Sequence, residues 1–356
     1  MKFQYQGVRI SGLQVVLPAR SVSFEDELGQ YNFTREQSLR LKKIMGYGAH
    51  RIVDPGTCAS DLAVAGIQHM FRSGYVDPHA VDALIVVTQS PDHFMPATSN
   101  LVQGRLGLGQ ETYCLDISQG CAGFVIGLIE AFGLLSQPEI RSVLLVNADV
   151  LSRKTSPRDR NSWPLVGDGA TIALVERDLT ALPVRAICRM DGSRADALMI
   201  PAGGFRRPSD QSSSVDEIDS NGNYRAADHL AMKGDAVFNF VQTEIPPLVK
   251  EALAFSDWDA EQVDYYLFHQ PNRFMLQKLA EKLRVPYERM PANIVEQFGN
   301  GSGITIPLAI WHNLRQSIVN RSWNVCLAGF GVGLSWAAMT MSLGPLAFCD
   351  EIDFGG

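Results

Sequence analysis

The segment Val81-Asp-Ala-Leu-Ile-Val-Val-Thr-Gln-Ser-Pro91 is a short apolar run with a polar end, and it resembles Val263-Asp-Tyr-Tyr-Leu-Phe-His-Gln-Pro271 in the second half of the chain. A second pair occurs at nearly the same offset, because Ser142-Val-Leu-Leu-Val-Asn147 resembles Trp323-Asn-Val-Cys-Leu-Ala328. Short runs rich in β-branched and aromatic residues are typical of buried strands. Two matched pairs at one offset indicate an internal repeat, so we expect two similar halves.

Predicted strands alternate with segments of helical pattern, which is typical of an α/β protein. We expect the first half to span residues 1–180 and the second to span residues 181–356. The stretch 206–227 is polar and rich in Ser, Asp, Asn and Gly, so we interpret it as an exposed excursion of the second half. Further strands are predicted at 8–16, 113–117, 170–175, 184–188 and 325–341, and helices at 59–72, 121–135, 232–255, 273–283 and 304–319.

Length and composition are those of a globular protein with a large core. The chain has 356 residues, of which 46% are hydrophobic and 19% charged, and no apolar run reaches the length of a membrane span. Its beginning lacks the apolar core of a secretory signal. The six cysteines show no Cys-x-x-Cys spacing, which favours reduced thiols and a cytoplasmic location. A net charge of −7 without a basic run argues against nucleic acid and anionic membranes as partners.

Cys121 opens the apolar segment Cys121–Leu135, directly after the predicted strand Tyr113–Ser118 and a Gln-Gly turn. We expect the thiol on the first turn of a buried helix, where free backbone N–H groups and the helix dipole favour a thiolate. The same N–H groups could hold the oxyanion that forms when a thiolate attacks a carbonyl. Free cysteine is also a common core residue, so this segment alone leaves a catalytic and a structural interpretation open.

Two polar side chains of the second half stand at the ends of predicted elements. His269 follows the apolar run Tyr265–Phe268, and Asn300 lies among glycines in Phe298-Gly-Asn-Gly-Ser-Gly303. Sites of α/β proteins are built at strand ends, and glycine lets a backbone approach a ligand closely. A Cys, a His and an Asn on three separate ends fit acyl transfer through a thiol. Each of the two also has an ordinary interpretation, as a structural hydrogen-bonding group or as a turn residue.

Several motifs carry a family resemblance. They are Asp116-Ile-Ser-Gln-Gly-Cys-Ala-Gly-Phe124, His269-Gln-Pro-Asn272, Gly299-Asn-Gly-Ser302, Gly329-Phe-Gly-Val-Gly-Leu-Ser-Trp336 and the glycine turn Gly167-Asp-Gly-Ala170. Taken in chain order, they resemble the motifs of the β-ketoacyl-acyl-carrier-protein synthase III family, and the similarity runs from about Val8 to Leu343. The resemblance implies a thiolase fold, with two similar βαβ-type halves in a layered α-β-α-β-α core, and a homodimer.

The resemblance also implies a catalytic triad of Cys121, His269 and Asn300. The Cys121 thiolate would take an acyl group from a thioester, and a malonyl-type thioester would then lose CO2 and attack the acyl-enzyme. Donors from His269 and Asn300 would stabilise the enolate oxygen. The backbone N–H groups of Cys121 and Val332 would form the oxyanion hole of the acylation step.

Four substrate contacts are implied as well, at Met95, Arg160, Phe238 and Asn272. Met95 stands where the family places a residue of one subunit at the end of the other's acyl pocket, and ordinary dimer packing is the alternative. The stretch Ser38–Gly46 lacks the tryptophan and arginine with which typical members hold coenzyme A, and offers Arg40 and Ile44 instead. This favours a carrier-protein-bound acyl donor over a coenzyme A donor. A basic cluster could meet a carrier protein or a coenzyme phosphate, or be solvated; it consists of Arg153, Lys154, Arg158 and Arg160.

We therefore expect a decarboxylating condensing enzyme, a ketosynthase III-like acyltransferase, that uses an acyl-coenzyme A or acyl-carrier-protein thioester and a malonyl thioester. The polar excursion and the absence of the usual coenzyme A-binding tryptophan and arginine favour a polyketide or other secondary pathway over fatty-acid initiation. One alternative is acyl transfer to an oxygen or nitrogen nucleophile, and another is a non-catalytic partner subunit. Asn300 argues against the first, because decarboxylation most needs two donors, and the intact triad against the second. No cofactor is expected, and no metal, because the other cysteines lack a histidine at ligand spacing.

Overall fold

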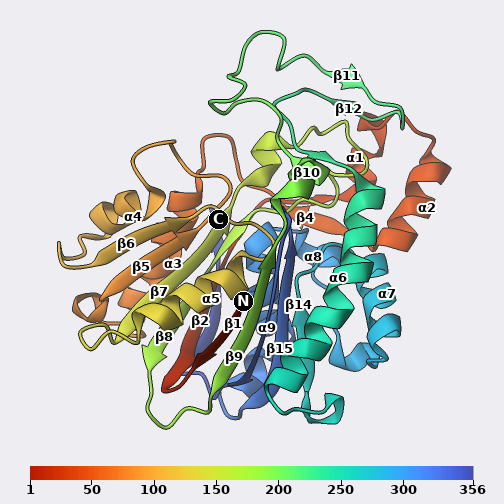
Figure 1. The fold of residues 1–356 in the computed structure, drawn as a ribbon. Helices are drawn as coiled ribbons and strands as arrows, with labels where there is room; N and C mark the ends of the chain where they lie inside the picture. The colour runs from red at the N-terminus through yellow and green to blue at the C-terminus, as the bar shows by residue number, and fades with distance from the viewer. Residues whose placement is uncertain (356) are drawn as a thin grey trace.

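The computed structural model describes residues 1–355, and two mixed β-sheets form its centre (Figure 1). The first sheet has the strand order β17 (Phe348–Phe354), β2 (Val8–Pro18), β8 (Gly169–Arg177), β7 (Ser142–Asp149), β5 (Ala83–Val87) and β6 (Tyr113–Ile117). The second has the order β1 (Lys2–Tyr5), β9 (Val184–Met190), β16 (Ser335–Leu343), β15 (Trp323–Gly331) and β14 (Tyr265–Phe268).

The strands of the predicted repeat occupy equivalent places in the two sheets. Strand β5 pairs in parallel with β7, and β14 pairs in parallel with β15. In each sheet two antiparallel strands follow, which gives the orders β5-β7-β8-β2 and β14-β15-β16-β9. The internal repeat is therefore confirmed as a repeat of topology. The division of the chain at residue 180 stays a prediction, and the terminal strands cross it, since β1 joins the second sheet and β17 joins the first.

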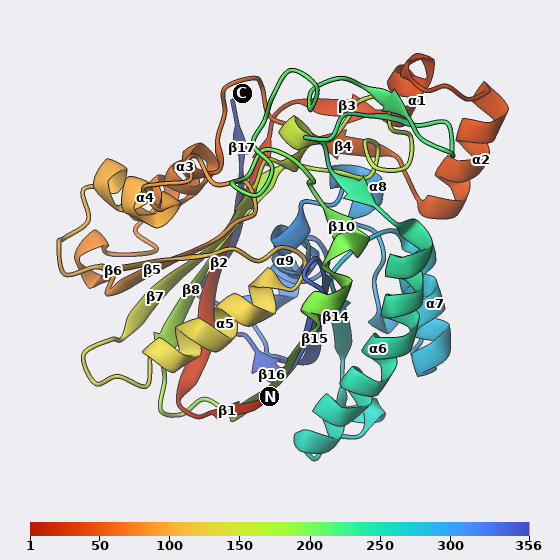
Figure 2. The same ribbon diagram turned by 45° about the horizontal axis from the view of Figure 1, so that its top comes forward.

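Helices form three layers, one between the two sheets and one on the outer face of each, as the tilted view in Figure 2 shows. Helices α5 (Gly123–Leu134) and α9 (Thr305–Ile318) lie between the sheets and contact strands of both. Helices α3 (Ala59–Arg72) and α4 (Thr98–Leu106) cover the outer face of the first sheet. Helix α6 (Gly234–Phe255) covers the outer face of the second, with α7 (Arg273–Leu283) packed beside it. The result is the α-β-α-β-α arrangement of the thiolase fold.

Short elements complete the fold around one end of the sheets. The remaining helices are α1 (Phe24–Glu27), α2 (Arg35–Met45) and α8 (Val295–Phe298). The remaining strands pair as β3 (Ser21–Ser23) with β4 (Ala49–Arg51), β10 (Leu198–Met199) with β13 (Ala231–Met232), and β11 (Glu217–Ile218) with β12 (Tyr224–Arg225). Turns of 3₁₀ helix lie at Leu28–Gln30, Pro78–Ala80, Leu151–Lys154, Gly192–Ala197, Ala260–Gln262, Tyr287–Arg289 and Ser302–Ile304.

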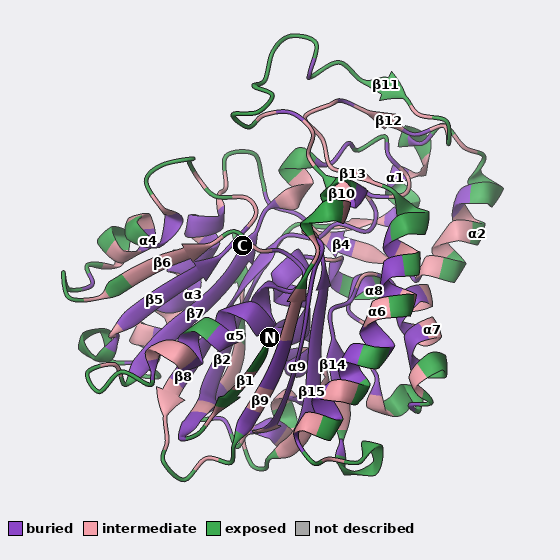
Figure 3. Cartoon of the chain, in the orientation of Figure 1, coloured by how far each residue is buried: buried purple, intermediate pink, exposed green. Residues whose placement is uncertain are grey.

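Burial explains why the central helix is apolar on every side. Helix α5 contains one charged residue, Glu130, and nine of its residues are buried, because a sheet lies on each side of it. Figure 3 shows the same pattern for most inner strands of the two sheets, which are buried along most of their length, whereas the edge strands β1, β6 and β17 are not. None of the helices among residues 1–355 combines the length and apolar character that a bilayer span requires.

The predicted strand 325–341 is wrong in one respect, because it is two strands. Strands β15 and β16 run antiparallel and are joined by a tight turn at Val332, Gly333 and Leu334. Gly333 has a φ of +133°, which an L side chain rarely adopts, so glycine permits the reversal here. The turn is important for the site, because it carries Val332 toward Cys121.

Candidate functional site

Cys121 lies in the turn between β6 and α5, two residues before the first helical residue, Gly123. Its side chain is buried against strand β15. A β-carbon on Gly331 would lie 2.7 Å from the Cys121 sulfur, and one on Gly329 would lie 2.7 Å from the α-carbon of Ala122. These two glycines therefore let the β15 backbone come into direct contact with the thiol.

The resting protonation state of Cys121 differs from the expectation. Burial raises the pKa of the thiol to about 11, while the Val332 N–H group and the Ser302 hydroxyl lower it by less. The thiol sits just outside the helix rather than on its first turn, and the packed β15 backbone excludes water from it. Desolvation thus outweighs the helix terminus, and the prediction of a resting thiolate is wrong.

His269 directly follows β14 and is buried, with 2% of its surface exposed. Its Nδ1 atom lies 2.7 Å from Thr305 Oγ1, and its ring meets the Phe330 ring edge to face with centroids 5.5 Å apart. Burial lowers the pKa of the imidazole to about 3. The ring is therefore neutral at physiological pH and carries one proton.

Asn300 is held by its backbone and by its own side chain. Its N–H group donates to Leu165 O at 2.6 Å, and its carbonyl accepts from Gly167 N at 3.1 Å. Its Oδ1 atom accepts from the Ser302 N–H group at 2.9 Å. Because Oδ1 is engaged in this way, the Nδ2 amino group is left to donate elsewhere.

Glycines make this segment possible through close packing of two backbones rather than through approach to a ligand. Gly299 has a φ of +79°, and a β-carbon on it would lie 2.8 Å from the backbone of Gly167. A β-carbon on Gly167 would in turn lie 2.2 Å from Phe298 O. The two glycine-rich motifs thus pack against each other, which places Asn300 beside the strand that ends the first half.

Two cavities meet at Cys121 and Asn300. One has a volume of about 190 Å³, and its wall is largely apolar; it is lined by Gln89, Leu151, Ser162, Leu165, Val166, Leu198, Met199, Ile200, Leu230, Met232, Ser302 and Val332. We call it the apolar cavity. The other has a volume of about 540 Å³ and includes His269, Asn272 and Phe238 in its wall. We call it the mixed cavity.

The structure therefore brings six predicted site residues together. Cys121, His269 and Asn300 line the mixed cavity, and Val332 lines the apolar cavity. Phe238 and Asn272 are also in the wall of the mixed cavity. Phe238 stacks on Phe274 with centroids 5.7 Å apart, and Asn272 caps helix α7 by accepting from Met275 N at 2.8 Å.

Met95 and Arg160 lie apart from both cavities. Met95 is 79% exposed in the single chain, next to the similarly exposed Phe94. The Arg160 guanidinium lies 3.3 Å from the ring centre of Phe33, in a separate open cleft that also contains Arg40 and Ile44. Neither residue contacts the Cys121 site within this chain.

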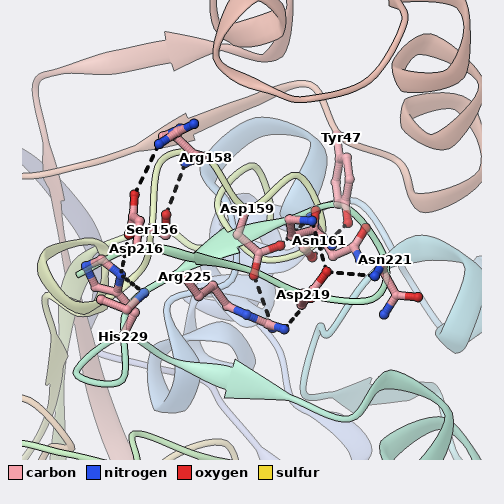
Figure 4. A network of polar contacts seen from close by, with 12 residues as sticks. Tyr47, Ser156, Arg158, Asp159, Asn161, Asp216, Asp219, Asn221, Arg225 and His229 are labelled. Atoms are coloured by element: carbon pink, nitrogen blue, oxygen red, sulfur yellow. Dashed lines mark hydrogen bonds and ion pairs between the residues drawn. The ribbon is translucent and has the colours of Figure 1, made fainter. Parts of the chain in front are cut away.

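The polar excursion is held in place by ion pairs, and it forms part of the wall of the mixed cavity. Arg225 pairs with Asp159 at 3.3 Å and also with Asp219, as Figure 4 shows. Asp219, Asn221 and Arg225 are part of the cavity wall. Most of residues 203–221 are exposed, as expected, but the end of the excursion, from Asp219 to Arg225, reaches the site.

Two of the four residues of the predicted basic cluster form ion pairs with the excursion and the residue that follows it. Lys154 pairs with Asp228 at 3.3 Å, and Arg158 pairs with Asp216 at 3.5 Å and covers the ring of Tyr224. The charges of Lys154 and Arg158 are therefore engaged in ion pairs within the chain. This favours a structural interpretation over a free docking surface for these two residues.

Polar residues behind Cys121 were not expected from the sequence. Asp149, at the end of β7, is fully buried and accepts from Gln89 N at 2.8 Å and from Ser90 Oγ at 3.0 Å. Burial raises its pKa to about 7. Thr305 contacts the His269 ring, and the Ser302 hydroxyl contacts the Cys121 thiol. The closeness of Ser302 and Thr305 to Asn300 in the sequence was the one signal that could have identified these two residues.

Metal ligation has no support in the described part of the chain. Residues 1–355 contain no group of three or more His, Cys, Asp and Glu side chains that could hold a metal ion. The six cysteines are free thiols, and Cys121 and Cys326 are the buried ones among them.

Comparison with known families gives two matches within the chain. Residues 115–188 match the family described as 3-oxoacyl-[acyl-carrier-protein (ACP)] synthase III, and residues 253–343 match its C-terminal family. The first match contains Cys121, and the second contains His269, Asn300 and Val332.

Individual relatives cover nearly the whole chain. A Campylobacter jejuni protein, provisionally named 3-oxoacyl-[acyl-carrier-protein] synthase 3, is 32% identical over 350 residues, which is 97% of each chain. The β-ketoacyl-[acyl-carrier-protein] synthase III 3 of Streptomyces coelicolor is 31% identical over 338 residues, covering 94% of this chain and 96% of that protein. The crystal structure of a 3-oxoacyl-(acyl-carrier protein) synthase from Burkholderia xenovorans superposes with a TM-score of 0.92 at 32% identity, covering 99% of both chains.

Proposed function

The chain belongs to the 3-oxoacyl-[acyl-carrier-protein] synthase III family, and we propose that Cys121 is its acylated nucleophile, with His269 and Asn300 as donors to the second substrate. It is a condensing enzyme that joins an acyl group to a malonyl-type thioester by decarboxylative condensation. The observation that carries the residue assignment is the meeting of all three side chains at one cavity. Transfer to an oxygen or nitrogen nucleophile is not favoured, because the relatives are named synthases.

In the first step the Cys121 sulfur attacks the acyl thioester. Since burial raises the thiol pKa, the proton must leave as the sulfur reacts. We assign its acceptor as the neutral imidazole of His269, which lies in the wall of the same cavity and which burial makes a weak base. The oxyanion of the tetrahedral intermediate would be held by the N–H groups of Cys121 and Val332. The contact of the Val332 N–H group with the sulfur, and the approach of β15 to Cys121, support this role.

In the second step the malonyl-type thioester loses CO2. The electron pair of the broken carbon–carbon bond becomes an enolate, whose charge lies on the thioester oxygen. Asn300 Nδ2 is free to donate to that oxygen, because Oδ1 is engaged by Ser302. A donor that acts on developing charge stabilises the transition state more than the ground state. The carbanion then attacks the acyl-enzyme and releases the Cys121 sulfur.

The decisive experiment separates the two steps. Single-turnover acylation and CO2 release from a labelled malonyl thioester are measured for His269→Ala and Asn300→Ala, with His312→Ala as a histidine control. We expect Asn300→Ala to lose about 100-fold in CO2 release and much less in acylation, since one donor is removed. Equal losses in both steps for Asn300→Ala would contradict the assignment and indicate a structural role.

We also propose a homodimer in which Met95 of one subunit closes the acyl pocket of the other. Met95 and Phe94 are 79% and 73% exposed, which is costly for neighbouring large apolar side chains in a free monomer. The apolar cavity begins at Cys121 and is the part of the site suited to an acyl chain. We expect a second copy of the chain to close this cavity.

For the acyl donor we propose a carrier-protein-bound thioester in a polyketide or similar pathway. Phe33 covers one face of the Arg160 guanidinium, so only the other face is left for stacking on a nucleotide base. The neighbouring Arg40 and Ile44 do not replace a tryptophan platform. Comparison of kcat/KM for one acyl group on coenzyme A and on a carrier protein tests this, and a preference for coenzyme A would contradict it.

A further inference from the structure

The hydroxyl of Thr305 is the side-chain hydrogen-bonding partner of the His269 Nδ1 atom, and the Ser302 backbone carbonyl also acts on the imidazole. Thr305 is the first residue of α9 and is fully buried. Its Oγ1 atom lies 2.7 Å from Nδ1, 3.0 Å from Ser302 O and 3.3 Å from Gln270 N. One side chain thus links the imidazole to the loop that carries Asn300.

These three contacts leave two arrangements of the protons. The Gln270 N–H group can only donate and the Ser302 carbonyl can only accept, whereas Nδ1 can do either. If the Thr305 hydroxyl donates to Ser302 O, Nδ1 must carry the ring proton and donate to Oγ1, which leaves a lone pair on Nε2. If the hydroxyl donates to Nδ1, the ring proton is on Nε2.

A neutral ring makes this choice important. Burial lowers the pKa of His269 to about 3, and the Ser302 carbonyl opposes this shift only in part. The resting imidazole therefore carries one proton, and the position of the Thr305 hydrogen decides which nitrogen has it. Rotation about one C–O bond reverses the Thr305 hydrogen bond, and a water molecule in the mixed cavity, whose wall includes His269, delivers a proton to Nε2 while the Nδ1 proton is released to solvent, which exchanges the two states.

We propose that Thr305 is a positioning residue that exchanges His269 between its two tautomers, so that one imidazole serves both steps. This inference rests on the proposed function. In acylation the lone pair on Nε2 accepts the Cys121 proton as the carbon–sulfur bond forms, and the departing thiolate takes that proton back. In decarboxylation Nε2–H donates to the enolate oxygen while the bond to CO2 breaks, and no proton is transferred.

The test compares Thr305→Val with Thr305→Ser. Valine has nearly the volume of threonine but cannot donate to Nδ1, so the ring proton stays on Nδ1, facing Ser302 O. We expect CO2 release to fall about 100-fold, as for the loss of one oxyanion donor, while acylation changes little. Serine keeps the hydroxyl, and both steps should stay close to those of the wild type. Equal loss of both steps in Thr305→Val, or no loss in either, would overturn the proposal.

A second measurement uses the wild-type protein and so does not depend on how a variant folds. Nitrogen NMR of histidine-labelled protein distinguishes the two tautomers, and the His269 signal is assigned from its disappearance in His269→Asn. We expect the proton on Nδ1 in the free enzyme and on Nε2 in the acyl-enzyme. The same tautomer in both states would overturn the inference. Failure of the wild type to form an acyl-enzyme would instead overturn the proposed function.

Discussion

At the scale of single residues, the reactivity of Cys121 must come from its neighbours. The buried thiol has a pKa raised to about 11, so the thiolate is scarce at neutral pH. The nearby His269 is neutral, and its pKa is lowered to about 3 by burial. A neutral thiol beside a neutral base holds no charge in an apolar site until the thioester arrives. This arrangement protects the thiol from oxidation and from unselective reaction.

The resting thiol predicts a specific pH dependence of alkylation. Because the pKa lies near 11, the thiolate fraction rises tenfold per pH unit between pH 6 and 9. The rate of inactivation by iodoacetamide without substrate should therefore rise log-linearly over this range, and substrate thioester should protect. A plateau near neutral pH would indicate a resting thiolate and contradict this account. Cys121→Ala supplies the background rate of the other cysteines.

Sequence reasoning predicted residues that the structure brings to one cavity, but it missed their environment. Cys121, His269 and Asn300 stand at the ends of patterned segments, so their positions could be predicted. The pKa of Cys121 depends on the packing of Gly329 and Gly331 against it, which is a contact between the two halves of the chain. No local pattern carries that information. Thr305 was missed for the same reason, since a threonine at the start of an apolar helix is common.

At the scale of elements, two connections shape the site. The turn between β15 and β16 brings Val332 to Cys121, and the excursion brings Asp219, Asn221 and Arg225 to the mixed cavity. The polar composition of the excursion predicted a surface segment, and its first part is one. Its ion pairs with the 154–159 loop join residues 58 to 74 positions apart, which leaves no periodic signal in the sequence.

The Arg225 pair should be important for stability and for substrate binding. Asp159 is fully buried, so Arg225→Met leaves a buried carboxyl group without its partner. We expect a loss of about 3 kcal/mol in the free energy of unfolding. We also expect a higher KM for the thioester that binds in the mixed cavity, because Arg225 is part of its wall. Arg158→Met is the matched control, because its pair with Asp216 is largely exposed and contributes about 1 kcal/mol or less. Urea unfolding and initial-rate kinetics measure both quantities; equal effects of the two changes would contradict the role of Arg225.

At the scale of the whole molecule, the two sheets share one layer of helices. The matching strand orders confirm the repeat, and the helices α5 and α9 fill the space between the sheets. The terminal strands β1 and β17 each pair within the sheet of the opposite half. The layers could be predicted from the repeat and the apolar helices, but the exchange of the ends could not. It depends on long-range pairing between residues near the two termini.

The proposed dimer predicts a link between Met95 and acyl-chain preference. Met95→Trp should fill the end of the partner's pocket and shift kcat/KM toward shorter acyl groups. One methylene in an apolar pocket is worth about 1–3 kcal/mol, so a chain-length series would detect the shift. Leu179→Trp is the control, since Leu179 is 88% exposed in the turn between β8 and β9. A monomer in sedimentation at assay concentration, or an unchanged chain-length profile, would contradict the proposal.

The central claim is that the condensing reaction passes through an acyl group on Cys121, and intact-mass spectrometry tests it most directly. Wild-type protein and Cys121→Ala are incubated with a panel of acyl-coenzyme A and acyl-carrier thioesters. The account predicts that the wild type gains the mass of one acyl group, that peptide mapping locates it on Cys121, and that a malonyl thioester removes it. The Cys121→Ala protein should gain no mass. Acylation of Cys121→Ala, or condensation by it, would contradict the account.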